Sequence, residues 1–445
     1  MSRSRIQQSL EKMGFFYVKN HYEAFIDYGI DLLNKMGSPD GFLKDSSCLR
    51  VDTPTLSDSA TVMVIDIGGT HTKAGLAAHL NSTEKDWDVL FDDDNHLFDI
   101  PGEGLPIERF TKALAQRLTK VFKEREIDPT KIDGVGIIWS NALVVQQLPE
   151  NGFPRGTTAL VTGYNHGNAY RKGEFFTKEL YDGFDIGQAF LNAMKEAHLT
   201  PKVFIIGNDT VFTLKACPKA DAGMVASTGA NATDIGDDGI IYNTEMGAIC
   251  SISKELLSEG DHVLCDWDQT KSSIKLEDLI SGKWLPRIFE GHVVALAKAG
   301  IESLADAAKY FSNDAINKLR GRDLEKLLKK EEVPEIFDVP ACRGCLDELR
   351  EIADLLIRRA GRLAAGMAYF SLYRQSKRKD SLVLSLDSSQ ARHLPGYLEA
   401  LKEQLEELLG TEKKVSIQLQ YPSGSIAVPM KGLAETLFGE LARLQ

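Results

Sequence analysis

The chain has 445 residues, of which 43% are hydrophobic and 26% are charged, so its composition is that of a globular protein with two or three domains. A formal net charge of −12 argues against broad affinity for nucleic acid or for anionic membranes, and neither is an expected partner. The apolar runs are shorter than the roughly 18 residues that predict a membrane span, and the amino terminus lacks the apolar core of a secretory signal.

The six cysteines are too sparse in a chain of this length to predict a disulfide framework, so a reducing, cytoplasmic location is expected. Cys342 and Cys345 have the spacing of a redox or metal pair, but the sequence offers no second pair of ligands beside them. We interpret them as reduced thiols in front of a helix.

The periodicity of apolar residues predicts helices and strands that alternate along the chain. Residues 150–175 are rich in glycine, asparagine and charge, and we expect a long loop region there. In chain order, the other expected elements are a helix within 1–60, a hairpin over 62–78, a strand at 87–91, a helix from Pro106, a strand at 134–140, a helix over 185–197, strands at 202–207 and from 223, helices through 274–375, a strand at 381–386, a helix around 398–408, a strand at 415–419 and a terminal helix. This alternation predicts an α/β protein with mixed sheets flanked by helices.

The expected hairpin carries residues that are typical of a phosphate site. The β-branched run Val62–Ile67 suits a buried strand, and Gly68 and Gly69 permit a tight reversal. Glycines at a hairpin tip leave backbone N–H groups uncovered, and such groups bind phosphate well. Asp66, at the end of the first strand, is suited to hold water around a metal ion on those phosphates. An ordinary surface turn is the alternative interpretation, but here an acid, glycines and hydroxyls coincide at one strand end.

Polar side chains follow the end of several expected strands. Ligands bind at the carboxyl ends of strands in open α/β sheets, so we expect these groups to converge. They are Asp66–Thr72, Ser140–Asn141, Asn208–Asp209, Thr228–Asn231 and Asp387–Ser389. The sequence contains no G-x-x-x-x-G-K-[ST] loop, no protein-kinase catalytic loop, no G-x-S-x-G elbow and no H-E-x-x-H motif.

Several of these segments resemble the hexokinases of the actin-like sugar-kinase superfamily. Asp66-Ile-Gly-Gly-Thr70 is similar to the first phosphate motif of that family, and Asn208-Asp209-Thr210-Val211 resembles the segment with the catalytic aspartate. The further resemblances are Phe176-Thr177-Lys178 to a sugar motif, Ser227–Asn231 to the second phosphate motif, Asn243–Ala248 and Leu276–Gly282 to segments with sugar-binding glutamates, and Leu386–Ser389 with Ser423–Ser425 to the adenosine end. The matches keep the family order over residues 61–430, so the set is far more specific than any one motif.

Three positions depart from the family pattern. The Ser-Phe-Pro of the sugar loop is replaced by Ser140-Asn141-Ala142, the glycine of Asp-Gly-Ser is Ser388, and the tryptophan after a sugar glutamate is Met246. These changes bear on which hexose is preferred and on how adenine is held. They leave the phosphoryl-transfer residues intact.

The resemblance implies a two-lobed actin-like ATPase fold (ribonuclease-H-like) and phosphorylation of a hexose, with D-glucose expected, at its 6-hydroxyl by ATP and Mg²⁺. The implied sugar-binding residues are Ser140, Asn141, Thr177, Lys178, Asn208, Asp209, Asn231, Glu245 and Glu277. The implied ATP- and phosphate-binding residues are Asp66, Gly68, Gly69, Thr70, His71, Lys73, Thr228, Gly229, Ser388, Ser389 and Gly424. No direct metal ligand is expected, because Mg²⁺ would be held through ATP, with Asp66 acting through water.

Asp209 is the candidate general base. A sugar hydroxyl is a poor nucleophile, so a carboxylate must take its proton as it attacks the phosphoryl group. Position alone leaves two interpretations of Asp209, a base or a helix N-cap, and the resemblance favours the base. Taken singly, Asn208, Asn231, Glu245 and Glu277 are each better interpreted as exposed polar residues or caps; the sugar pocket is predicted from the set, together with Thr177 and Lys178.

The expected small lobe comprises 61–207 with the terminal helix 431–445, and the expected large lobe comprises 208–430 with the helical segment 1–60. One alternative function is a kinase of the same fold for mannose, fructose or an amino sugar. The other is a non-catalytic sugar sensor or an ATP-driven binding protein. The presence of Asp209 and both glutamates argues against a non-catalytic sensor.

Overall fold

The computed structural model describes residues 4–16, 19–36, 60–68, 71–78, 87–94, 107–140, 142–149, 154–161, 170–172, 175–177, 183–263, 273–312, 319–330 and 332–444. The chain divides into two compact units. Unit 1 comprises Met1–Lys35, Met224–Ala232 and Glu245–Leu419, and unit 2 comprises Met36–Gly223, Thr233–Thr244 and Gln420–Gln445.

This division differs from the predicted lobe boundary near Gly207. The helix that follows this glycine, α5 (Asp209–Lys215), packs against the terminal helix α16 (Val428–Ala442) within unit 2. A Cβ atom at Gly432 would lie 1.9 Å from the carbonyl oxygen of Phe212, so the two helices touch backbone to backbone. Because of this packing, the chain stays in unit 2 beyond α5.

Unit 2 is built on a seven-stranded sheet of order β3-β2-β1-β4-β9-β6-β5. Its strands are β1 (Val62–Ile67), β2 (His71–Ala77), β3 (Trp87–Asp94), β4 (Gly134–Trp139), β5 (Leu143–Gln147), β6 (Arg155–Val161) and β9 (Val203–Gly207). The predicted hairpin is confirmed as β1 and β2, and β1, β4 and β9 run parallel in the centre. Every residue of β4 and of β9 is buried, as expected of central strands covered on both faces.

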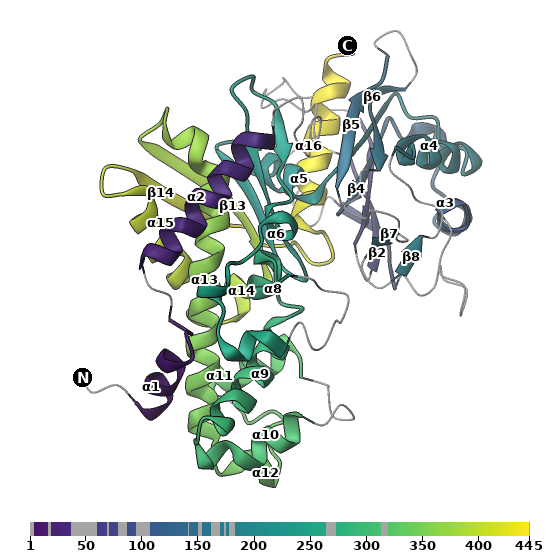
Figure 1. Cartoon of the computed structure of the whole chain (residues 1–445). Helices are drawn as coiled ribbons and strands as arrows, with labels where there is room; N and C mark the ends of the chain where they lie inside the picture. Colours follow the sequence, from purple (N-terminus) through teal and green to yellow (C-terminus); the bar gives the residue numbers. More distant parts are fainter. Residues whose placement is uncertain are drawn as a thin grey trace. The chain divides into compact units, whose positions relative to one another are not determined.

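Helices cover both faces of this sheet (Figure 1). On one face lie α3 (Ile107–Glu124) and α4 (Ile186–Glu196), where Phe190 makes edge contacts with Phe110 and Trp139. On the other face α5 and α16 enclose a second apolar core with β1 and β9. Gly136 of β4 provides the room for α16, because a Cβ there would lie 2.6 Å from the side chain of Leu433.

The predicted long loop over 150–175 is wrong at 155–161, where β6 pairs with both β5 and β9. Thr157, Ala159 and Val161 alternate toward the interior, and this alternation is the strand signal. The hydroxyl of Thr157 donates to the carbonyl of Ile206 in β9 (3.1 Å) and accepts from the N–H of the same residue (3.0 Å). Both backbone polar groups of Ile206 are therefore hydrogen-bonded. The flanking glycines and charges concealed this short pattern. Within the same region, β7 (Tyr170–Lys172) pairs with β8 (Phe175–Thr177).

Unit 1 contains most of a second sheet, of order β12-β11-β10-β13-β14. The strands are β10 (Ala222–Ala226), β11 (Ala230–Ile235), β12 (Ile241–Asn243), β13 (Ser381–Ser388) and β14 (Lys414–Leu419). β13 and β14 are parallel, whereas β10 and β11 form an antiparallel pair. The far end of β11 continues into unit 2 and pairs there with β12.

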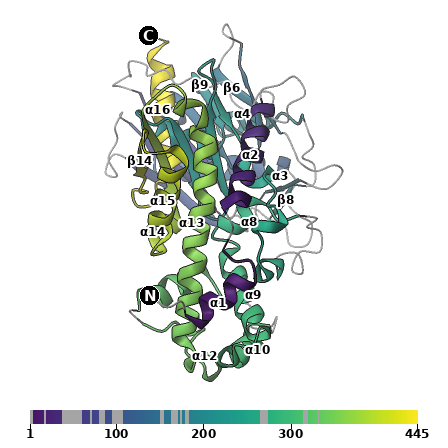
Figure 2. The same cartoon turned by 60° about the vertical axis from the view of Figure 1, so that its left-hand side comes forward.

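The long helix α13 (Leu346–Ser376) runs through unit 1, with α2 (Lys19–Met36) and α15 (Tyr397–Leu409) packed against it (Figure 2). Phe25 of α2 contacts Phe370, and the hydroxyl of Tyr22 donates to the carbonyl of Arg362 at 2.8 Å. The other α-helices described in unit 1 are α1 (Arg5–Lys12), α6 (Met246–Ile249), α8 (Leu276–Ile280), α9 (Leu285–Lys298), α10 (Ala305–Phe311), α11 (Gly321–Lys329), α12 (Pro340–Arg343) and α14 (Ser389–His393).

Cys342 and Cys345 are free thiols just before α13, as the sequence predicts. Burial raises the pKa of the Cys342 thiol to about 12 and that of Cys345 to about 11. A thiol with such a pKa carries almost no thiolate near neutral pH, so both side chains act as small apolar groups of the core.

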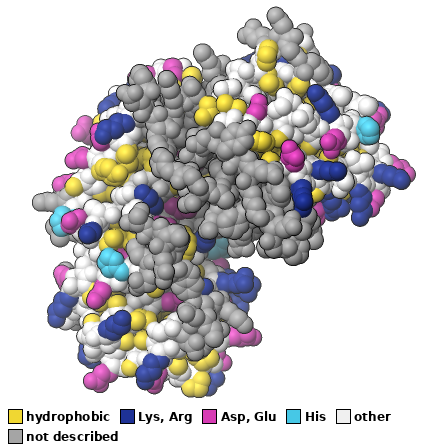
Figure 3. Space-filling model, turned by 45° about the vertical axis from the view of Figure 1, so that its right-hand side comes forward, with side chains coloured by type: hydrophobic (Ala, Val, Ile, Leu, Met, Phe, Trp, Pro, Cys, Tyr) yellow, Lys and Arg dark blue, Asp and Glu magenta, His cyan; other side chains and the backbone are white. Residues whose placement is uncertain are grey.

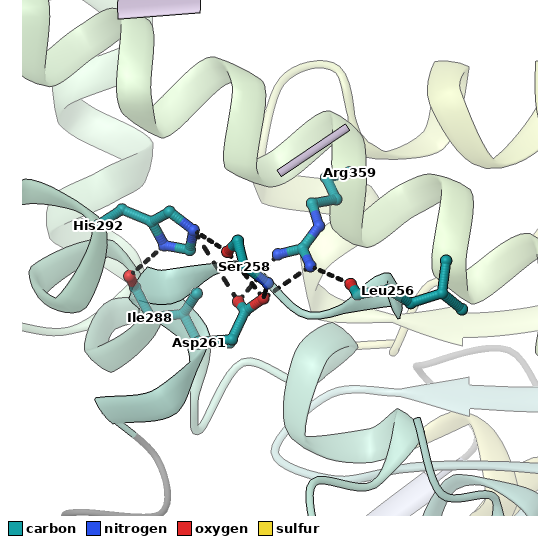
Figure 4. A network of polar contacts seen from close by, with 6 residues as sticks. All are labelled: Leu256, Ser258, Asp261, Ile288, His292 and Arg359. Atoms are coloured by element: carbon teal, nitrogen blue, oxygen red, sulfur yellow. Dashed lines mark hydrogen bonds and ion pairs between the residues drawn. The ribbon is translucent and has the colours of Figure 1, made fainter. Parts of the chain in front are cut away.

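A buried ion pair ties α13 to the loop that precedes α8 (Figure 4). The guanidinium of Arg359 donates from Nη1 to Oδ1 of Asp261 (2.9 Å) and from Nη2 to Oδ2 (2.7 Å), and Nη2 also donates to the carbonyl of Leu256 (2.7 Å). Desolvation alone would raise the pKa of Asp261, but the charge and hydrogen bonds of Arg359 outweigh it and hold that pKa at about 2. The ring of Phe15 covers Arg359 at 4.9 Å, so the segment after α1 docks on this pair.

His292 of α9 belongs to the same network. Its Nδ1 lies 2.7 Å from the carbonyl of Ile288, which can only accept, so Nδ1 carries the proton. Burial lowers the pKa of His292, and Nε2 of the ring lies 2.7 Å from the hydroxyl oxygen of Ser258, which is itself 2.9 Å from Oδ2 of Asp261. Ser258 and His292 thus add hydrogen bonds to the buried Asp261–Arg359 pair in an apolar interior.

Basic and acidic side chains are interspersed on the face shown in Figure 3, outside the grey residues. Within the described ranges, the chain forms no helix with the length and apolar character needed to cross a bilayer.

Candidate functional site

Three parallel strands of unit 2 end at the same edge of their sheet. The register places Asp66 of β1 beside Ile138 of β4, and Ile138 beside Gly207 of β9. Ser140 follows β4 directly, and Asp209 follows β9 after one residue. The strand register thus brings Asp66, Ser140 and Asp209 to one edge, with the side chain of each only partly buried. Asn141 lies outside the described residues.

Asn208 and Asp209 have different roles at the start of α5. Asn208 is 2% exposed, and its Oδ1 accepts from the N–H (2.9 Å) and the hydroxyl (2.6 Å) of Thr210, so Asn208 is the N-cap. The N-cap interpretation of Asp209 is therefore wrong. Asp209 is the first residue of the helix, where Oδ1 accepts from the N–H of Thr210 at 2.8 Å. This contact orients the carboxylate at the positive end of the helix dipole.

The described part of the β1–β2 tip is held by a bond from the N–H of Gly68 to the carbonyl of His71 (2.9 Å). Lys73 and His71 both face Asp92 of β3, with Nζ at 3.1 Å and Nδ1 at 3.5 Å from its carboxylate oxygens. The charge of Lys73 is thus partly satisfied within the sheet. Gly69 and Thr70 lie outside the described residues, as does Lys178; of Thr177 only the backbone, in β8, is described.

A second turn lies in unit 1, between β10 and β11. The N–H of Ser227 donates to the carbonyl of Gly229 (2.8 Å), which leaves Thr228 exposed at the tip. Glu277 of α8 lies under this turn and accepts from the N–H of Ala230 at Oε2 (3.4 Å). A Cβ at Gly229 would lie 3.4 Å from the same oxygen, so the turn rests directly on the carboxylate.

Glu245, the residue directly before α6, contacts the same turn, and its side chain makes no capping hydrogen bond to that helix. The Nδ2 group of Asn231 donates to Oε1 of Glu245 at 3.2 Å. The backbone of Glu245 is left-handed (φ +49°), a conformation that costs a residue other than glycine roughly 1–3 kcal/mol and is concentrated at functional sites. Gly247 follows, and a Cβ there would lie 1.9 Å from the carbonyl oxygen of Ala230, so α6 approaches the strand backbone closely. One amide and two half-buried carboxylates, Asn231, Glu245 and Glu277, thus gather around the turn.

The end of β13 lies beside this turn. Ser388 is fully buried with φ −144°, which any residue adopts, and its hydroxyl accepts from the N–H of Ala391 (3.0 Å). The backbone at Ser388 does not require glycine, and the serine side chain caps α14. A serine can therefore occupy the position at which the hexokinase motif Asp-Gly-Ser has glycine. The N–H of Ser389 donates to the hydroxyl oxygen of Ser227 (3.3 Å). In unit 2, Gly424 has φ +57° in a tight turn closed by two hydrogen bonds between Ser423 and Ile426.

The sequence motifs do not predict two polar residues of α14, Gln390 and Arg392, as part of the site. Gln390 is buried and bonds to the carbonyl of Ser227, and Arg392 forms an ion pair with Asp387 at 2.7 Å. Burial raises the pKa of Asp387 despite that partner. The available signal was a glutamine placed directly after a strand that ends in serines, which is a weak pattern by itself.

Among the described residues, no group of three or more His, Cys, Asp and Glu side chains is arranged to hold a metal ion. Asp66 is a single carboxylate at a strand end, a donor suited to a hydrated Mg²⁺ that is bound mainly by phosphates.

The architecture and these strand-end turns define the class of the protein. Mixed sheets flanked by helices, with a polar turn after β1 in one unit and after β10 in the other, form the actin-like sugar-kinase fold. Two hexokinase structures support this assignment. The hexokinase from Schistosoma mansoni complexed with glucose superimposes with a TM-score of 0.75 at 18% identity, over 98% of this chain and 100% of that one. A second hexokinase gives a TM-score of 0.70 at 17% identity, over 98% and 99%.

Two sequence comparisons match this chain to hexokinases. Residues 214–427 match the family model for hexokinase. The chain is 26% identical over 297 residues to hexokinase-1 of rice (Oryza sativa subsp. japonica), and this match covers 59% of each protein. Together with the fold, these findings support the resemblance to the hexokinase family. The resemblance drawn from the motifs and the predicted fold class are both confirmed.

Proposed function

We propose that this protein is a hexokinase-type phosphotransferase that transfers the γ-phosphoryl group of ATP to the 6-hydroxyl of a hexose, with D-glucose as its substrate. The observation that carries the proposal is the carboxylate of Asp209. It lies at the end of β9, is oriented by the first turn of α5, and is not needed as the helix cap because Asn208 has that role. The match to the hexokinase family model and the glucose complex of a structural neighbour support the same reaction.

In the proposed reaction Asp209 takes the proton of the 6-hydroxyl. The sugar oxygen forms a bond to the γ-phosphorus, the bond from that phosphorus to the β,γ-bridging oxygen breaks, and ADP leaves with the electron pair. Such transfers depend mainly on positioning and on charge stabilisation. Mg²⁺ would supply part of that stabilisation by neutralising the phosphate oxygens, and Asp66 would hold it through water.

The other proposed ligands follow from their chemistry. Carboxylates and amides can each satisfy two hydroxyls of a polyol, which suits Asn231, Glu245 and Glu277 to the sugar. Ser140, Asn141, Thr177, Lys178 and Asn208 are the further proposed sugar ligands. The proposed ligands of ATP are Gly68, Gly69, Thr70, His71, Lys73, Thr228, Gly229, Ser388, Ser389 and Gly424. Since Lys73 already pairs with Asp92, we rank it below the hydroxyls of Thr70 and Thr228.

A kinase for mannose, fructose or an amino sugar is the second candidate, and the observation that favours it is the altered sugar loop at Ser140–Ala142. Release of ADP, followed by a coupled assay with each of these sugars and with glucose, tests the proposal. We expect the highest kcat/KM with glucose. A higher value with another sugar would reassign the substrate, and equal ADP release with and without every sugar would reject the sugar-kinase function.

Replacing Glu245 or Glu277 by glutamine should raise the KM for the sugar by an order of magnitude or more. A charge-assisted hydrogen bond to a hydroxyl is about twice as strong as a neutral one, and the amide retains the shape of the side chain. Glu403→Gln on the exposed face of α15 is the matched control and should behave like the parent. Steady-state kinetics and a melting curve measure the effect. If both variants bind the sugar as the parent does, the carboxylates belong to another function.

A further inference from the structure

Gln390 lies where three segments of unit 1 meet: the β10–β11 turn, the end of α8 and the end of β13. It is in the first turn of α14 and is 2% exposed. Its Nε2 group donates to the carbonyl oxygen of Ser227 at 2.7 Å, and its Oε1 accepts from the hydroxyl of Ser389 at 3.2 Å. The carbonyl can only accept, so the amide nitrogen must be the atom that faces it.

The carbonyl of Ser227 is also bound from a second side. The N–H of Gly282, which follows α8, donates to the same oxygen at 2.7 Å. These two donors occupy both lone pairs of the carbonyl oxygen of Ser227. The hydroxyl oxygen of Ser227 accepts a further hydrogen bond from the N–H of Ser389 (3.3 Å). Ser227 is the residue that begins the turn with Thr228 at its tip, so these contacts fix the position of the turn.

The space around the amide allows little adjustment. A Cβ atom on Gly282 would lie 2.3 Å from Nε2 of Gln390, so the glycine is what lets the amide reach the carbonyl. Glu277 lies on α8, which ends two residues before Gly282, and it supports the other end of the same turn through Ala230. A single amide thus connects the β10–β11 turn, the end of α8 and the end of β13.

We propose that Gln390 is a positioning residue, one that couples the phosphate-binding turn at Thr228 to the nucleoside-binding segment at Ser388–Ser389. It contacts neither substrate. It acts by holding both segments in one geometry, so that the triphosphate and the nucleoside of a single ATP molecule are bound together. This inference rests on the proposed function, because that function assigns the two segments to ATP.

The chemistry at this position requires a donor and an acceptor on one planar group. Glutamate retains the acceptor and loses the donor, and its charge faces the carbonyl of Ser227. Methionine has a similar length and retains neither. When the glutamate of a Gln390→Glu variant is protonated, its O–H can again donate to the carbonyl, so that variant should recover as the pH falls.

The test compares Gln390→Glu and Gln390→Met with the full-length parent. We expect Gln390→Glu to raise the KM for ATP about 10- to 100-fold, as expected for a lost hydrogen bond and a buried charge, with the KM for the sugar unchanged. The ratio of the ATP KM of Gln390→Glu to that of the parent should fall toward one as the pH is lowered. Gln390→Met should show a raised KM for ATP without this pH dependence. Gln418→Glu, an exposed change in β14, is the matched control.

A parental KM for ATP in both folded variants would overturn the inference. So would an equal rise in both KM values accompanied by a lower melting temperature, which indicates a structural role only. If Gln390→Met does not fold, the pH dependence of Gln390→Glu decides alone.

Calorimetric binding of ADP separates this inference from the proposed function. If the parent phosphorylates no sugar but Gln390→Glu weakens ADP binding, the proposed function fails and the role of Gln390 stands. If the parent is active and Gln390→Glu binds ADP equally well, only the role of Gln390 fails. A parent that binds no adenine nucleotide contradicts both.

Discussion

Asp209→Asn is expected to lower kcat by about 10²–10⁴-fold, the usual contribution of a general base. The amide has the size of the carboxylate but cannot take the proton of the sugar hydroxyl. Folding should be retained, because Asn208 caps α5 and an asparagine oxygen at 209 can still accept from the N–H of Thr210. We therefore expect a melting temperature and an ATP affinity close to those of the parent.

Steady-state turnover, a melting curve and calorimetric titration with ATP measure these three quantities. Asp306→Asn is the matched control, because Asp306 also lies in the first turn of a helix, α10, and is exposed. The control should keep the activity of the parent. Near-parental turnover by Asp209→Asn would reduce this residue to an ordinary helix start and refute the proposed mechanism.

Breaking the buried pair of Asp261 and Arg359 is expected to lower the free energy of unfolding by about 3–5 kcal/mol in either single variant. Asp261→Asn leaves the guanidinium without its counter-charge, and Arg359→Met leaves the carboxylate without one; both side chains are buried. The double variant has no buried charge in this pair, so its loss should be well below the sum of the two single losses. Additive losses in a denaturant titration would show that the two charges do not depend on each other.

The same pair predicts how stability varies with pH. The pKa of Asp261 is about 2 in the folded protein and roughly 3.9 in an unfolded chain, so this stabilisation is complete above pH ~4 and is lost as the pH falls toward ~2. The loss amounts to about 2–3 kcal/mol for a shift of this size. The double variant should lack this loss of stability at acid pH. It should retain the loss of stability below pH ~6.5 that comes from His292, because burial favours the neutral form of that ring. Identical pH profiles for parent and double variant would contradict the account.

The elements that could be predicted from the sequence are those whose apolar pattern is long or repeated. The β1–β2 hairpin has such a pattern and is confirmed, and the long helix α13 lies at the end of the region 274–375 in which helices are predicted. β6 was missed because its seven residues lie between glycines and charges, and its strand pattern becomes decisive only beside β5 and β9. Local composition cannot show which neighbours a short strand will find.

In the candidate site, too, local patterns predict some residues, whereas others depend on contacts between distant segments. The order of the motifs leads to Asp209, Glu245 and Glu277, since each stands within a distinctive run of residues. The left-handed backbone of Glu245 and the capping by Asn208 depend on packing that no local pattern specifies. The role of Gln390 depends on its hydrogen bond to the carbonyl of Ser227. Because Ser227 is far from Gln390 in the sequence, no local pattern predicts this contact.

Identification of the product tests the central claim most directly. The purified protein is incubated with ATP, Mg²⁺ and glucose, and the products are analysed by phosphorus and carbon NMR. We expect one molecule of glucose 6-phosphate for each ADP, with the phosphoryl group on the 6-oxygen. ADP formed with inorganic phosphate in place of a sugar phosphate, or a phosphoryl group on any other oxygen of glucose, would contradict the account.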